Sequence, residues 1–154
     1  MNITSFYPVL ATNDVAATAT FYRTHFGFDT SFESDWYVSL RLDSWELAIL
    51  QADHPTIPEQ FRARVASGML LNIEVRDVDA LYGRLVASGL EPVLPLRSED
   101  FGQRHAIFAG PDAVLIDIIT PIAPSDAYLG QFSAEALEEA KDGQGLPRLA
   151  LDLL

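Results

Sequence analysis

The segment FGQRHAIFAGPDAVLIDIITP, residues 101–121, contains the residue of this sequence that most needs a chemical explanation. It ends in an apolar run with the pattern of a buried strand, yet Asp117 lies in the middle of that run. An ionised carboxylate in a dry interior is costly unless it is paired or bound to something. Asp117 is therefore expected either to form a structural pair or to bind a ligand.

Two stretches, residues 12–28 and 75–90, share one pattern: an Asp-Val pair, an apolar stripe at helical spacing, and then a glycine. Asp14 and Asp77 are natural N-caps, because their carboxylates can accept hydrogen bonds from the free amides of a first helical turn. Gly27 and Gly89 can adopt the left-handed conformation that closes a helix. The residues predicted to face the core are Val15, Ala19, Tyr22 and Phe26 in the first helix, and Val78, Leu81, Tyr82 and Leu85 in the second.

Each predicted helix follows one extended apolar run and precedes three others, with Asp, Ser, Gly or Pro in the turns. The expected strands are 3–10, 28–34, 36–42 and 45–51, then 69–75, 91–96, 104–109 and 113–120. The sequence therefore predicts an α+β fold of two tandem βαβββ modules. The expected boundaries are a first module at 1–52, a linker with a short helical piece at 53–68, a second module at 69–121, and a tail at 122–154 with a surface helix at 133–143.

Composition limits the partners of this chain. The sequence has no cysteine, which excludes disulfides, thiolate zinc sites and cysteine nucleophiles. The formal net charge of −12 repels phosphate backbones and anionic membranes, so neither nucleic acid nor a membrane is expected as a partner. A cationic or neutral small molecule is compatible with this charge. The N-terminus lacks the pattern of a secretory signal, so the expected location is cytoplasmic.

The two modules, with YPVLATNDVAATATFYRTHFGF opening the first and FGQRHAIFAGPDAVLIDIITP closing the second, resemble the vicinal oxygen chelate superfamily. This superfamily contains glyoxalases, extradiol dioxygenases, fosfomycin-resistance transferases and bleomycin-binding proteins. The resemblance covers residues 3–120 and implies curved mixed sheets around a cavity, with helices on the outer face. It also implies a homodimer, to which the apolar end at 146–154 could contribute.

In metal-dependent members of the superfamily, four inward side chains hold one divalent ion. The resemblance places these positions at Tyr7, Ala48, Leu70 and Asp117. Only Asp117 is a ready donor, because Ala48 and Leu70 have hydrocarbon side chains and Tyr7 is a phenol that is neutral at pH 7. A transition-metal ion in such a site needs three or four nitrogen or oxygen donors. No metal ion or other cofactor is therefore expected.

Strand alternation predicts which side chains line the implied cavity. There Asp117 is expected to stay hydrated or to accept hydrogen bonds from Tyr7 and Arg41. Arg104 and His105 are adjacent, so only one of them can face inward, and the sequence leaves open which one. The predicted ligand-binding residues are Tyr7, Tyr37, Ser39, Arg41, Glu46, Leu70, Asn72, Glu74, His105 and Asp117.

Two function classes fit these residues. The first is a metal-free protein that binds a small cationic or aromatic molecule in a homodimer, as bleomycin-resistance members do. The alternative is an enzyme: a metal-dependent lyase or dioxygenase, or a protein that uses Asp117, Glu74, Tyr7 or His105 for metal-free acid–base chemistry. A scaffold without a ligand is a third reading. No nucleophile and base stand together in the sequence, so it favours binding over catalysis and assigns no catalytic residue.

Overall fold

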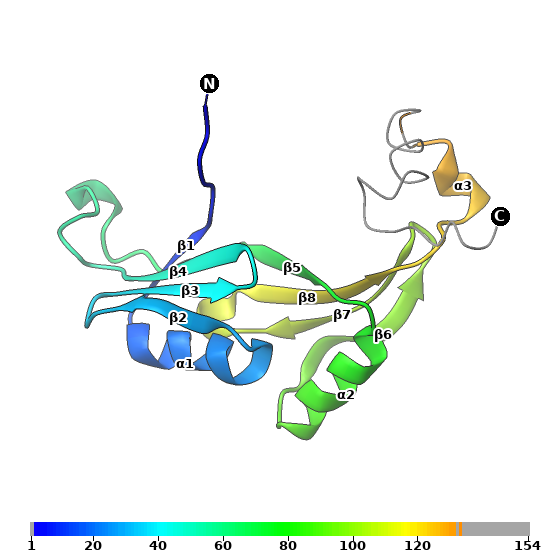
Figure 1. Ribbon diagram of the computed structural model, residues 1–154, viewed down its shortest axis with the longest axis horizontal. Helices are drawn as coiled ribbons and strands as arrows, with labels where there is room; N and C mark the ends of the chain where they lie inside the picture. Colours follow the sequence, from blue (N-terminus) through cyan, green and yellow to red (C-terminus); the bar gives the residue numbers. More distant parts are fainter. Residues whose placement is uncertain (1, 132, 134–154) are drawn as a thin grey trace. The chain divides into compact units, whose positions relative to one another are not determined.

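The computed structural model describes residues 2–131 and 133 (Figure 1). The chain forms two units, Met1–Met69 with Gly110–Val114, and Leu70–Ala109 with Leu115–Leu154. Each unit contains one four-stranded mixed sheet and one of the two longer helices, an α+β arrangement consistent with tandem βαβββ modules. The predicted helix at 133–143, apart from Ser133, and the apolar end at 146–154 lie outside the described residues. No helix within the described part is long and apolar enough to cross a membrane.

The first unit follows the predicted order. Its elements are β1 (Val9–Thr12), α1 (Val15–Phe26), β2 (Asp29–Glu33), β3 (Tyr37–Leu42), β4 (Trp45–Gln51) and the short 3-10 helix η1 (Glu59–Phe61) in the predicted linker. The strands lie in the order β1-β4-β3-β2, with β1 parallel to β4 and the other neighbours antiparallel.

The second unit repeats this plan. Its elements are β5 (Leu70–Glu74), α2 (Val78–Ala87), β6 (Pro92–Glu99), β7 (Gln103–Ala109), β8 (Leu115–Pro121) and α3 (Asp126–Leu129). The strands lie in the order β5-β8-β7-β6, with β5 parallel to β8. The 3-10 turn η2 (Pro111–Ala113), which belongs to the first unit, connects β7 to β8.

Both longer helices begin at the predicted caps. The Ala17 amide donates to the Asp14 carboxylate at 2.8 Å, and the Ala80 amide donates to the Asp77 carboxylate at 2.9 Å. Gly27 closes α1 with a left-handed φ of 75°, a conformation that a side chain would strain. Its amide donates a hydrogen bond to the Arg23 carbonyl.

Each helix packs its apolar stripe on one face of its own sheet, α1 against β3 and β4, and α2 against β6, β7 and β8. The predicted stripe residues are buried except Tyr82, which is half-buried at the edge of its stripe, with its ring 5.9 Å from that of Phe108. Strand residues on the helix-covered faces are Leu10, Val38, Leu40, Leu47 and Ile49, and Ala106, Phe108, Ile116 and Ile118. Full burial of a large apolar side chain contributes about 1.5–3 kcal/mol. The packing of each helix on its own sheet therefore stabilises each unit separately.

Two strand predictions are wrong at their ends. The first strand begins at Val9 rather than at residue 3, because only Val9–Thr12 pair with β4, and Phe6 is 95% exposed. Strand β6 continues to Glu99 instead of ending at residue 96, because its last residues pair with the start of β7 after two register shifts. This extension places Arg97 and Glu99 in the sheet.

Trp36 directly precedes β3, and its ring stacks on that of His54 with centroids 3.9 Å apart.

Candidate functional site

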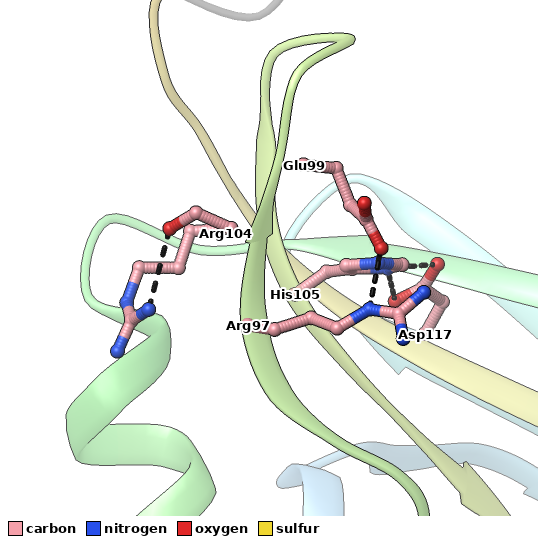
Figure 2. Close-up of polar contacts among 6 residues, drawn as sticks. Arg97, Glu99, Arg104, His105 and Asp117 are labelled. Atoms are coloured by element: carbon pink, nitrogen blue, oxygen red, sulfur yellow. Dashed lines mark hydrogen bonds and ion pairs between the residues drawn. The ribbon is translucent and has the colours of Figure 1, made fainter.

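The face of the second sheet opposite α2 carries a cluster of polar side chains from three adjacent strands. In the ladders, Ile107 pairs with Asp117, and Arg97 pairs with His105. Because side chains two residues apart on a strand share a face, His105 lies on the same face as Asp117. Arg104 must then lie on the other face, as Figure 2 shows. The alternative that the sequence left open is thus resolved in favour of His105.

Asp117 forms a buried pair with His105. The Nδ1 atom of His105 lies 2.9 Å from Oδ1 and 3.0 Å from Oδ2 of Asp117, and the two residues are 6% and 4% exposed. Desolvation raises the pKa of Asp117, and the bond to His105 acts in the opposite direction. The expected donors Tyr7 and Arg41 belong to the first unit, and within its own unit the acid is satisfied by His105.

The cluster continues to two residues that the sequence analysis missed. His105 Nε2 lies 3.5 Å from Oε1 of Glu99, and Arg97 Nε donates a hydrogen bond to that same oxygen. The bond from Arg97 lowers the pKa of Glu99, with desolvation opposing it and His105 adding a smaller contribution. A predicted strand that continued to Glu99 would have placed Arg97 and Glu99 on the same face by alternation. We call Arg97, Glu99, His105 and Asp117 the polar cluster (Figure 2).

On the opposite face, Arg104 ties β7 to α2. Its Nε and Nη2 atoms donate to the two carboxylate oxygens of Asp79 at 2.7 and 2.6 Å. Nearby, Thr120 Oγ1 donates to the Val75 carbonyl and accepts from the Val78 amide. Hydrogen bonds from Arg104 lower the pKa of Asp79. This pair anchors the first turn of α2 and is separate from the polar cluster.

The first sheet gathers several of the predicted residues on its face opposite α1. Ser39 Oγ donates to Glu46 at 2.9 Å, and Arg41 pairs with Glu46 in the ladder. Burial raises the pKa of Tyr37 to about 12, with further contributions from a hydrogen bond with Tyr7 and from the Glu46 charge. Tyr37 is therefore a neutral phenol, and this face holds no buried acid–base pair among the residues described.

Strand β5 presents the remaining predicted residues. Leu70, Asn72 and Glu74 alternate with half-buried neighbours and are all exposed, and Asn72 pairs with Asp117 in the parallel ladder. Desolvation raises the pKa of Glu74. The structure thus brings Asn72 beside the polar cluster, while Leu70 lies farther along the strand.

The four implied metal positions can now be compared with their surroundings. Ala48 and Asp117 occupy equivalent positions in the two units. Ala48 pairs in parallel with Val9, and Asp117 pairs in parallel with Asn72. Val9 and Asn72 each lie five residues before the aspartate that caps the helix of their unit. Ala48 is a methyl group, and both oxygens of Asp117 face His105. The other two positions, Tyr7 and Leu70, are a phenol and a hydrocarbon. These side chains do not fit a divalent ion, and the described residues contain no group of three His, Asp or Glu suited to one.

Similar folds occur in several solved structures. A glyoxalase/bleomycin resistance protein/dioxygenase from Nocardioides is 22% identical, with a TM-score of 0.64, covering 77% of this chain and 84% of its own. A glyoxalase-related enzyme from Fulvimarina pelagi is 24% identical, with a TM-score of 0.61 and coverages of 76% and 88%. A bleomycin resistance determinant encoded on the transposon Tn5 is 19% identical, with a TM-score of 0.57 and coverages of 80% and 99%.

These identities support the fold alone, and no curated protein matches the chain. The family assignment comes from sequence: the model of the Glyoxalase/Bleomycin resistance protein/Dioxygenase superfamily matches residues 5–118. This chain therefore belongs to the Glyoxalase/Bleomycin resistance protein/Dioxygenase superfamily.

Proposed function

We propose that this protein is a binding member of its superfamily that holds a small molecule without a metal ion. One observation carries the proposal: the single carboxylate among the four implied metal positions, Asp117, is already engaged through both oxygens by His105. The side chain equivalent to Asp117 in the first unit, Ala48, cannot donate an electron pair.

The proposed ligand is cationic or aromatic. The net charge of −12 favours a cation. Aromatic groups are available on the first sheet, where Phe32 is 54% exposed with its ring 6.2 Å from that of Tyr37. The likeness to a bleomycin resistance determinant agrees with binding, whereas the likeness to a lactoylglutathione lyase from Agrobacterium tumefaciens agrees with the enzyme alternative.

We propose a homodimer as the functional form. The first unit exposes several large apolar side chains that a partner could cover, among them Phe6 at 95% and Trp45 at 74%. Sedimentation equilibrium at micromolar protein concentration should give twice the mass of the chain. A monomer across the whole concentration range would refute the dimer and leave the binding proposal standing.

The test of binding without metal has two stages. Purified protein is titrated calorimetrically with zinc, nickel and iron(II), and we expect no stoichiometric ion. A thermal-shift screen of cationic glycopeptides and planar aromatic compounds then follows, in which a ligand at 100 times its dissociation constant stabilises the protein by about 2.7 kcal/mol. A stoichiometric metal ion of submicromolar affinity would support the lyase or dioxygenase alternative. A screen without any shift would favour the enzyme or scaffold readings.

A further inference from the structure

The polar cluster presents two donors to a single acceptor oxygen. Arg97 Nε and His105 Nε2 both face Oε1 of Glu99, from β6 and β7 respectively. An ionised carboxylate can only accept hydrogen bonds, so Arg97 is the donor in its contact, and His105 Nε2 is a donor to the same oxygen whenever it carries a proton. The free protein thus already contains a carboxylate held by a guanidinium and an imidazole, which is a common way of recognising a carboxylate.

The orientation of the His105 imidazole is fixed by Asp117, which contacts Nδ1 on the side of the ring away from Glu99. Both oxygens of Asp117 lie within 3.0 Å of Nδ1, and His105 is only 6% exposed. Nδ1 is therefore engaged and Nε2 is aimed at Glu99, in the same way that a carboxylate orients a histidine in other sites. The Phe101 ring and the imidazole form a T-shaped pair, with centroids 6.0 Å apart.

The carboxylate of Glu99 is the more exposed of the two acids in the polar cluster. Glu99 is the last residue of β6, directly before the turn that contains Gly102 with a φ of 101°. Its contact with His105 is 3.5 Å, at the long limit of a hydrogen bond, and its side chain is 22% exposed. The side chain of Arg97 is 57% exposed, and in the described residues its guanidinium donates only through Nε. Its two terminal nitrogens therefore remain available to a second carboxylate oxygen.

We infer that Arg97 and His105 form a binding site for the carboxylate of a small organic ligand, and that Glu99 occupies this site in the free protein. The ligand carboxylate replaces Glu99, accepts a hydrogen bond from His105 Nε2–H, and pairs with the guanidinium of Arg97. This inference rests on the proposed function, and it adds one chemical group, a carboxylate, to the expected ligand. The other charged group on this face, Glu74 on β5, is separated from His105 by Ile119 in the ladder and makes no contact with either donor in the described residues.

Acetate is the probe, and the variant Glu99→Ala removes the built-in competitor. A side chain on a short link competes at an effective concentration in the millimolar range, so its removal should tighten the binding of an acetate ion of millimolar affinity by about twofold or more. Binding is followed by the 15N chemical shift of His105 Nε2 during titration with sodium acetate, against sodium chloride at equal ionic strength. Glu99→Gln, which keeps the size of the side chain and removes its charge, should tighten acetate binding in the same direction.

Two further variants make the result specific. Glu74→Ala removes a carboxylate from the same face without touching either donor, and should bind acetate as weakly as the wild type. Adding Arg97→Gln to Glu99→Ala should abolish the gain, because one of the two donors is then missing. Equal acetate affinity in the wild type, Glu99→Ala and Glu99→Gln would overturn the inference, as would a gain that survives Arg97→Gln. A stoichiometric metal ion would instead refute the proposed function, and the acetate titrations of the metal-free protein would still test this inference.

Discussion

The two units place different side chains at the same two positions. Where β8 of the second unit carries Asp117, the equivalent position of β4 in the first unit carries Ala48. On the neighbouring strands, His105 pairs with Ile119 and Tyr37 pairs with Leu50. Ile119 and Leu50 each lie two residues after the equivalent pair, so His105 and Tyr37 are equivalent as well. One unit thus has an imidazole and a carboxylate where the other has a phenol and a methyl group.

This difference shows that the residues that set the fold are separate from the polar residues on the opposite face of each sheet. The caps Asp14 and Asp77 and the apolar stripes are common to both units, and they set each helix on its sheet. The opposite face of each sheet is free to vary, provided that a buried charge has a partner. In the second unit His105 meets this condition for Asp117, and in the first unit Ala48 has no charge to satisfy.

The largest effect is expected from placing the acid in the wrong unit. Ala48 is fully buried, so Ala48→Asp would bury a carboxylate beside the neutral Tyr37. The free energy of unfolding, measured with urea, should fall by about 3–5 kcal/mol. The double variant Ala48→Asp/Tyr37→His, which recreates the pair of the second unit, should recover about 1.5 kcal/mol or more. A single variant as stable as the wild type would contradict the role given to pairing.

A somewhat smaller effect is expected from breaking the native pair. His105→Leu leaves Asp117 buried without its partner and should lower the free energy of unfolding by about 3 kcal/mol. The double variant His105→Leu/Asp117→Leu removes both polar groups and should regain most of this loss, because an apolar pair of similar volume needs no partner. Additive losses in this double-mutant cycle would show that the two residues are not coupled.

The common scaffold predicts equal effects in the two units. Asp14→Ala and Asp77→Ala each remove one cap whose hydrogen bond has nearly the same length, 2.8 and 2.9 Å. Each should cost about 1 kcal/mol in urea unfolding. Asn at the same positions, which also accepts from the first-turn amides, should restore most of the stability. A large cost in one unit alone would mean that the two helices are not held in the same way.

The smallest effect concerns alkaline stability and belongs to the first unit. The pKa of Tyr37 is raised to about 12, so the folded chain keeps a proton that the unfolded chain, with a tyrosine pKa near 10, has lost. Between pH 10 and 12 the folded state therefore binds more protons, and stability falls as pH rises. Tyr37→Phe should make this fall shallower in urea titrations at successive pH values. An unchanged slope would remove Tyr37 as a cause of the alkaline fall.

Local signals in the sequence were sufficient for the modules, the caps and most strands. A capping aspartate acts through neighbouring amides, and an apolar stripe depends only on helical spacing, so both can be recognised without tertiary structure. The choice between Arg104 and His105 could not be made, because it depends on the register of β7 against β8. Arg97 and Glu99 were missed for a similar reason: two register shifts in β6 let the strand continue to Glu99, past its predicted end.

The partner of Asp117 was also beyond the reach of the sequence. His105 is twelve residues away along the chain and meets the acid only through the pairing of β7 with β8. The acid itself could be identified as unusual, because an isolated charge in an apolar run needs a partner wherever it lies.

The central claim is that the side chains at the implied metal positions cannot hold a divalent ion. In the most direct test, the purified protein is exposed to zinc, nickel and iron(II) and passed through gel filtration without chelator. Its bound metal is then measured by elemental analysis. The account predicts no stoichiometric metal in the wild type and the same result for Asp117→Asn. One tightly held ion per chain that is lost in Asp117→Asn would contradict it.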